Sequence, residues 1–90
     1  MKVENMTNNN GNKIVNQFII YQDDQIFFQS YNTMIAMVQD HYIELDANYW
    51  NYSKTTSKYR NQFLNMTTKE IENAIKNGLI TLTDLNHEGA

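Results

Sequence analysis

The sequence predicts a small α+β domain, in which an antiparallel β-meander of three to four strands packs with two α-helices and a final C-terminal strand. Short runs of β-branched and aromatic residues alternate with polar turns up to residue 46. After Trp50 the apolar spacing changes to three and four residues, which is typical of a helix. Another alternating run follows Gly78. A chain of 90 residues forms one domain with a modest core.

The two ends of the chain are expected to be flexible. Residues 1–16 contain the polar stretch 8–12, which has no periodicity and includes Gly11. Residues 86–90 are similarly polar. We therefore expect a flexible N-terminal segment over 1–16, a single α+β domain over 17–85 and a flexible tail over 86–90.

The first half of the domain has the composition of strands. Residues 18–21 and 26–29 flank the polar turn 22–25, a pattern that predicts a hairpin. Residues 34–38 are apolar at every position, as in a buried central strand, although periodicity alone also allows a helical turn. Residues 41–46 alternate, so their odd-numbered side chains should share one face of the sheet.

The first helix is predicted after Trp50, with Ser53 or Thr55 as its cap. Its apolar face consists of residues spaced by four, three, four and three positions, which we expect to pack in the core. These residues are Tyr52, Thr56, Tyr59, Phe63 and Met66.

The second helix has a recognisable start and end. Thr67 and Glu70 form a capping-box pattern, and Met66 with Ile71 fits a hydrophobic staple. Gly78 suits the left-handed position that ends a helix. The buried stripe is expected at Ile71, Ala74 and Ile75, and residues 79–83 should form the closing strand.

No motif for catalysis, metal binding or a cofactor stands out. The chain has no cysteine and only two histidines, and on a strand His41 would point away from Glu44 and Asp46. No apolar run is long enough to cross a bilayer, and the N-terminus lacks the apolar region of a signal peptide. These features favour a non-enzymatic protein of the cytoplasm, without a cofactor or a membrane partner.

Charge is distributed unevenly along the chain, and each part has two interpretations. The basic residues after position 53 could contact a protein or the phosphates of a nucleic acid, or form a solvated helix face. The acids between residues 23 and 46 could imitate a row of phosphates, or lie on a solvated sheet face. The predicted partner-binding residues are Trp50, Lys54, Ser57, Lys58, Arg60 and Asn61. The secondary acidic surface is Asp23, Asp24, Glu44 and Asp46.

Residues 50–64 follow the pattern W-x-Y-S-x-T-T-x-K-Y-x-x-x-F-L. With this segment, residues 17–85 resemble a family of small uncharacterised proteins from bacteriophages and mobile elements of low-GC Gram-positive bacteria. The resemblance assigns no site residues. It implies a small accessory protein in the cytoplasm of a bacterial host.

That setting, together with the missing catalytic groups, predicts a protein that binds and blocks a host protein. The sharpest form of this hypothesis is an anti-CRISPR-like inhibitor of a nuclease-based defence system. The alternative is a small nucleic-acid-binding accessory protein that contacts phosphates through the basic helix at 53–64.

Overall fold

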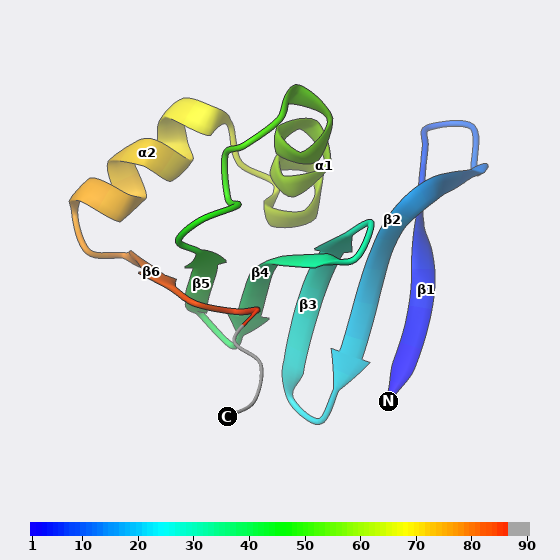
Figure 1. Cartoon of the computed structure of the whole chain (residues 1–90), viewed down its shortest axis with the longest axis horizontal. Coiled ribbons are helices and arrows are strands. Elements are labelled where there is room, and N and C mark those ends of the chain that lie inside the picture. Colours follow the sequence, from blue (N-terminus) through cyan, green and yellow to red (C-terminus); the bar gives the residue numbers. More distant parts are fainter. Residues whose placement is uncertain (87–90) are drawn as a thin grey trace.

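Six strands form one sheet, and both helices pack on the same face of it (Figure 1). The computed structural model describes residues 1–86. Strand order follows chain order; every neighbouring pair is antiparallel except β5 and β6, which are parallel. The elements are β1 (Lys2–Thr7), β2 (Lys13–Gln22), β3 (Gln25–Ser30), β4 (Thr33–Gln39), β5 (Tyr42–Asp46), α1 (Lys54–Leu64), α2 (Thr68–Lys76) and β6 (Ile80–Thr83). The α+β class, the two helices and the closing strand are confirmed, but the sheet has more strands than predicted.

The N-terminal segment differs most from its prediction. Instead of a flexible stretch, it forms β1 and the first part of β2. The polar stretch is only the loop of this hairpin, where the side chain of Asn8 accepts hydrogen bonds from the backbone of Asn10 and Asn12. Met6 faces the core and is 3% exposed. A single inward methionine is too weak a periodic signal to identify a strand from sequence.

Tight turns connect the next three strand pairs. Asp23, Tyr31 and Asp40 each have a φ between 54° and 57°, in the left-handed region. Asp tolerates this conformation, whereas Tyr31 adopts it at a steric cost. The predicted hairpin around residues 22–25 is confirmed, and so are the strands at 34–38 and 41–46.

The core lies between the sheet and the two helices. Phe28 of β3, Leu45 of β5 and Ile71 of α2 are fully buried there. The ring of Phe63 from α1 stacks on Phe28, with 5.7 Å between centroids. Neither helix in the described part of the chain has the length and apolar composition that crossing a bilayer requires.

The ends of α1 follow from local chemistry. The Ser53 hydroxyl accepts a hydrogen bond from the backbone N–H of Thr56 at 3.1 Å, so Ser53 rather than Thr55 is the cap. Asn65, with φ of 55°, ends the helix. Tyr52 precedes the cap and is half exposed, so its predicted place in the core is wrong.

Helix α2 matches its prediction closely. The Thr67 hydroxyl accepts from the backbone N–H of Glu70, and the Glu70 carboxylate accepts from the N–H of Thr67 at 2.8 Å. At the other end, Gly78 has φ of +77° and the N–H of Leu79 bonds to the carbonyl of Ala74. This turn directs β6 back to the sheet beside β5.

A buried carboxylate fixes the end of the sheet. Asp46 is fully buried, and one of its oxygens accepts from the backbone N–H groups of Asn48 and Tyr49 at 3.1 and 2.9 Å. The other oxygen accepts from the N–H of Leu85 at 2.9 Å. Asn86 bonds to the backbone of Met34, so its expected place in a flexible tail is not what the structure shows. Residues 87–90 of that predicted tail lie outside the described part.

Replacing Asp46 should destabilise the domain strongly. In Asp46→Ala, three backbone N–H groups lose a charged acceptor, and we expect the free energy of unfolding to fall by about 3 kcal/mol. Urea unfolding followed by circular dichroism measures this change. The control is Asp24→Ala, at an exposed turn position, which should change stability by less than about 0.5 kcal/mol. Equal effects of the two variants would contradict the assigned role.

The capping box of α2 should make stability depend on pH. Hydrogen bonds from Thr67, first its backbone N–H and then its hydroxyl, hold the pKa of Glu70 below its ordinary value of 4.5. A carboxylate with a lowered folded-state pKa stabilises the fold above its unfolded-state pKa, and this contribution disappears as the pH falls through the folded-state pKa. The wild type should therefore be more stable than Glu70→Gln at pH 7, and the difference should vanish in acid below about pH 4. Urea unfolding of both proteins across this range tests it; a difference independent of pH would contradict it.

Candidate functional site

Two exposed tyrosines mark the candidate contact surface. Tyr49 and Tyr52 are 41% and 50% exposed, and their rings meet edge to face with centroids 5.3 Å apart. Together with Asn51, Lys54 and Lys58 they form what we call the tyrosine–lysine surface. Tyr31 and Tyr42 are exposed as well, so what distinguishes Tyr49 and Tyr52 is the contact between their two rings.

The loop that carries the two tyrosines is held at both ends. Asp46 bonds to the backbone N–H of Tyr49 through its side chain, and its carbonyl accepts from the N–H of Trp50 at 3.0 Å. Ser53 caps α1 immediately after Tyr52. Both rings therefore project from a backbone that is already ordered.

An open hollow of about 360 Å³ lies beside Tyr52 at the start of α1. The Ser57 hydroxyl donates to the side-chain oxygen of Asn51 at 3.1 Å on one side of it. Apart from Tyr52, the residues around the hollow are polar or charged: Asn51, Ser53, Lys54 and Ser57. The hollow thus places hydrogen-bonding groups next to an exposed ring.

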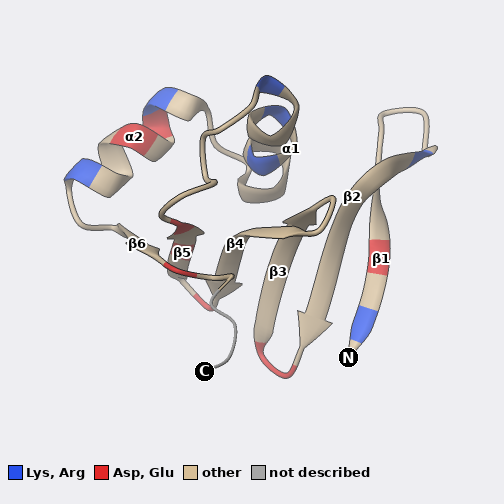
Figure 2. Cartoon of the chain, in the orientation of Figure 1, with Lys and Arg blue, Asp and Glu red and all other residues tan. Residues whose placement is uncertain are grey.

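Lys54 and Lys58 are one helical turn apart on α1 and both are exposed. Figure 2 shows in blue where Lys and Arg lie on α1. Neither forms an ion pair within residues 1–86. The ammonium of Lys58 lies 5.3 Å from the centre of the Tyr59 ring. These lysines are the part of the predicted basic surface that remains available to a partner.

Arg60 is not at the surface, contrary to what its place in the basic segment indicated. It is fully buried, and its guanidinium lies 5.3 Å from the centre of the Trp50 ring. One nitrogen donates to the carbonyl of Trp50 at 2.5 Å and to Asn51, while the others donate to Asn61 and Thr68. Burial lowers the pKa of Arg60, and the more distant Glu72 opposes that shift.

Trp50 and Asn61 take part in the same internal network. Trp50 is half-buried against the core, and Asn61 donates its amide to the Thr68 hydroxyl at 3.0 Å. The network therefore joins the loop, α1 and the start of α2. Of the six predicted partner-binding residues, only Lys54 and Lys58 are exposed, and Ser57 is half-buried.

The predicted acidic residues do not form one surface. Asp23 and Asp24 lie in the turn between β2 and β3, where Asp24 accepts from Gln39 at 3.0 Å. Glu44 is on β5 and accepts from the hydroxyl of Tyr42 at 2.7 Å, which raises the pKa of Tyr42. Asp46 is buried. The burial of Asp46 leaves Asp23, Asp24 and Glu44 for an acidic surface, and their contact with a partner stays a prediction.

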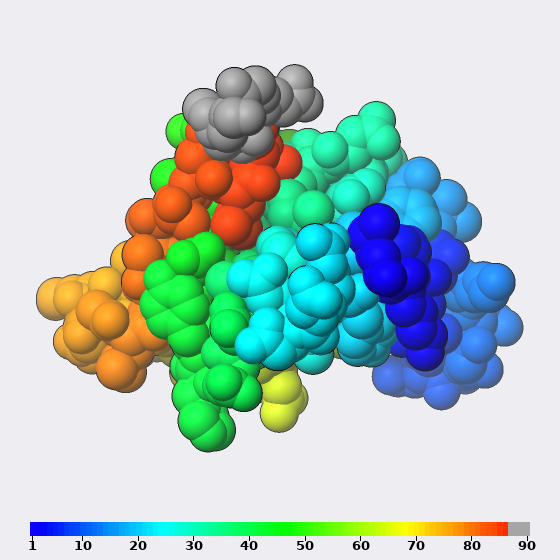
Figure 3. All heavy atoms as spheres, turned by 90° about the horizontal axis from the view of Figure 1, so that it is seen from below, coloured from blue at the N-terminus to red at the C-terminus, as the bar shows by residue number. Residues whose placement is uncertain are grey.

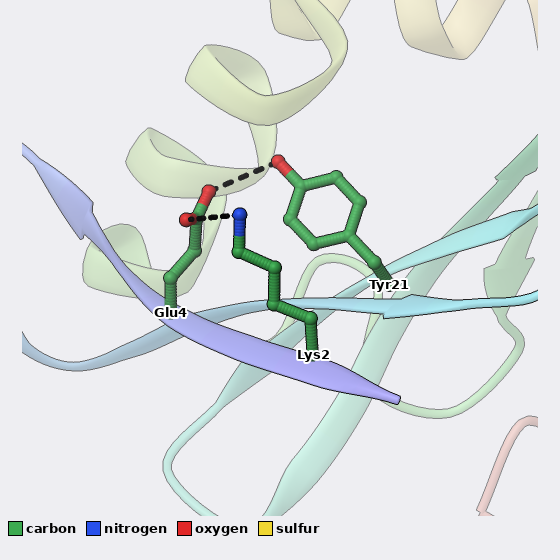
Figure 4. A network of polar contacts seen from close by, with 3 residues as sticks. All are labelled: Lys2, Glu4 and Tyr21. Carbon is green, nitrogen blue, oxygen red and sulfur yellow. Dashed lines mark hydrogen bonds and ion pairs between the residues drawn. The ribbon is translucent and has the colours of Figure 1, made fainter.

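A groove near the N-terminus was not foreseen, because its residues belong to the segment expected to be flexible. Its volume is about 430 Å³, and Met6, Ile19 and Phe63 are among the residues that line it. At its rim Glu4 accepts from the hydroxyl of Tyr21 at 3.0 Å and pairs with Lys2 at 3.6 Å (Figure 4). The hydrogen bond to Glu4, and then burial, raise the pKa of Tyr21.

Within residues 1–86, no three histidine, aspartate or glutamate side chains are grouped as metal ligands would be. His41, the one described histidine, is exposed beside the turn between β4 and β5.

The chain belongs to a family of unknown function (DUF8033), whose model matches residues 1–78. This agrees with the expected resemblance to an uncharacterised family, and it includes the N-terminal hairpin in the family's domain. No curated protein and no solved structure matches the chain.

The role of Arg60 can be separated from that of the exposed lysines by stability. Arg60→Ala leaves the carbonyl of Trp50 and the side chains of Asn61 and Thr68 without their donor, and we expect a loss of about 3 kcal/mol. Arg60→Lys should recover only part of it, because an ammonium cannot reproduce the planar fork of donors. Lys58→Ala, the matched surface control, should change stability by less than about 0.5 kcal/mol. Urea unfolding compares the three; an Arg60→Ala protein as stable as Lys58→Ala would contradict the network.

Proposed function

We propose that this protein is a non-enzymatic binding protein that docks on a partner protein through the tyrosine–lysine surface. The observation that carries the proposal is the exposed edge-to-face pair of Tyr49 and Tyr52 on an ordered loop. Tyrosine is enriched among the residues that dominate binding energy at protein interfaces. Its ring offers a large contact area and loses little conformational freedom on binding.

The neighbouring charges favour an acidic partner surface. Lys54 and Lys58 are exposed and free of ion pairs within the described residues. Rim charges of this kind increase the rate of association and select the partner more than they add affinity. The hollow beside Tyr52 could receive a polar side chain of the partner.

The sharper form of the proposal is a phage-encoded inhibitor that blocks a host protein stoichiometrically in the bacterial cytoplasm. A nuclease of a CRISPR-like defence system is the partner we propose first. What supports this form is the resemblance of residues 17–85 to proteins of phages and mobile elements. The inhibitor hypothesis also fits the exposed tyrosine pair, whose neighbours on the tyrosine–lysine surface are Asn51, Lys54 and Lys58.

A nucleic-acid partner is the alternative, and the two free lysines are the observation in its favour. With Arg60 buried, only Lys54 and Lys58 of the predicted basic surface are available for phosphates. Two contacts give weak binding that salt abolishes. The net charge of −3 adds repulsion.

The test compares a double variant on the surface with a matched tyrosine variant elsewhere. Tyr49→Ser/Tyr52→Ser should weaken binding to the partner at least about tenfold, because it removes the rings that supply the contact area. Tyr31→Ser, at a position 52% exposed in the turn between β3 and β4, should bind like the wild type. The measurements are affinity for a partner captured from host lysate and then purified, and inhibition of DNA cleavage by a reconstituted CRISPR nuclease.

Three outcomes would contradict the surface, the sharper form or the class of partner that we propose. If both tyrosine variants retain full affinity, the surface is wrong. If the captured partner is bound but nuclease cleavage is unaffected, the general proposal stands and its sharper form fails. If the protein instead binds random DNA and loses that binding steeply as salt increases, the nucleic-acid alternative replaces it.

A further inference from the structure

The face of the sheet opposite the helices carries an unexpected apolar row. The strand register aligns Val3 with Ile20, Ile20 with Phe27 and Phe27 with Met37, across β1 to β4. Residues that are directly opposite in neighbouring strands point to the same face of a sheet. An antiparallel sheet covered on one side normally turns polar side chains to the other.

The burial pattern shows that this row is separate from the main core. Phe28 and Ala36, which alternate with the row along their strands, belong to the cluster beneath the helices. Ile20 and Met37 are only 9% and 4% exposed, yet they are not members of that cluster. Their burial is therefore separate from that cluster, and the edge of the row remains open at Val3, which is 55% exposed.

Neither helix reaches this face, since the core residues of α1 and α2 pack with Phe28 and Leu45 on the other. Within residues 1–86, the segment after β6 runs past one end of the sheet, where Asn86 bonds to Met34. β1 and β6 are the two edges of the sheet, and they lie at opposite sides of the molecule (Figure 3). Within residues 1–86, neither helix therefore covers the apolar row, as a layer of helices usually does for a sheet face of this composition.

The face is also almost free of charge. The paired positions around the row are uncharged: five are amides, and the others are Phe18, Met34 and Tyr42. The amides are Asn5, Gln22, Gln25, Gln29 and Gln39. Beyond Met37 the row continues to Glu44 on β5 and Thr81 on β6. Glu44, the one carboxylate of the row, therefore lies near the β6 edge of the sheet. The two charged residues of β1, Lys2 and Glu4, are opposite Tyr21 and Ile19 and thus belong to the other face.

We infer that this face binds a second copy of the chain, with the two sheets packed face to face around a two-fold axis. In such a dimer the same patch lies on both sides of the interface, so charges of one sign would repel their symmetry mates. An uncharged apolar and amide face avoids this repulsion, whereas the rest of a molecule of net charge −3 does not.

The size of the face sets the strength of the dimer. Six strands about 4.8 Å apart and about six residues long give a face of about 500 Å². Two such faces bury about 1,000 Å² in total, which is near the lower limit for a specific interface. The dimer should therefore dissociate on dilution. Helix α1 lies on the other side of the sheet, so Lys54 and Lys58 remain accessible in it.

Sedimentation velocity of the whole chain from about 1 µM to about 1 mM tests the inference, because weak interfaces assemble in this range. We expect a concentration-dependent shift from monomer to dimer. Phe27→Lys, in the centre of the row, and Val3→Lys, at its exposed edge, should each weaken dimerisation about tenfold or more. Leu79→Lys, at a position 71% exposed after α2, is the control with the same charge change and should dimerise normally.

Folding and geometry are checked separately. Melting curves show whether the Phe27→Lys protein is folded. If it is unfolded, the Val3→Lys protein still tests the face, because Val3 is 55% exposed and its replacement should not disturb folding. The chain has no cysteine, so Phe27→Cys and Leu79→Cys each carry one thiol. A bismaleimide that spans about 10 Å, the spacing of packed sheets, should join two Phe27→Cys chains but not two Leu79→Cys chains. A monomer at every concentration, or equal loss of dimer in the Val3→Lys and Leu79→Lys proteins, would overturn the inference.

Discussion

The guanidinium of Arg60 is the interaction on which the helical half of the domain depends. It is fully buried, and its donors reach the carbonyl of Trp50, the side chain of Asn61 and the hydroxyl of Thr68. The loop before α1, α1 itself and the start of α2 therefore meet at one group. A buried cation is costly unless its donors are satisfied, so this conformation forms only when all three segments are in place. This requirement favours a single conformation, because a buried network with some donors unpaired has a higher free energy than one in which all are paired.

Asp46 fixes the first part of the loop before α1, just as Arg60 fixes its last part. Its carboxylate binds two N–H groups at the beginning of the loop and one from the segment after β6. The loop that carries Tyr49 and Tyr52 is thus anchored by a buried anion on one side and a buried cation on the other. An exposed loop normally loses conformational freedom on binding, at a cost in free energy. This loop is already ordered in the free protein, which favours a tight contact through the two rings.

Local signals were sufficient for much of the fold, whereas tertiary burial of polar groups was not predictable. The capping box at Thr67 and Glu70, Gly78 and the alternation of residues 41–46 each depend on neighbours a few positions away, and each is confirmed. Arg60 looked like part of a basic surface because a sequence does not show that Trp50, Asn61 and Thr68 will converge on it. The N-terminal hairpin was missed for a different reason: β1 is held by pairing with β2 rather than by a strong pattern of its own.

The distribution of charge separates the two surfaces of the molecule. On the helical side, the Arg60 cation is buried and hydrogen-bonded, whereas Lys54 and Lys58 are exposed beside the tyrosine pair. On the other side of the sheet, the paired positions around Ile20, Phe27 and Met37 are amides, apolar side chains or Tyr42. A charged surface gains most from a partner of different composition, because complementary charge requires an opposite sign. An uncharged apolar face has no such requirement and can meet its own copy. The same sheet can thus assemble with itself on one side and leave the tyrosine–lysine surface for another protein.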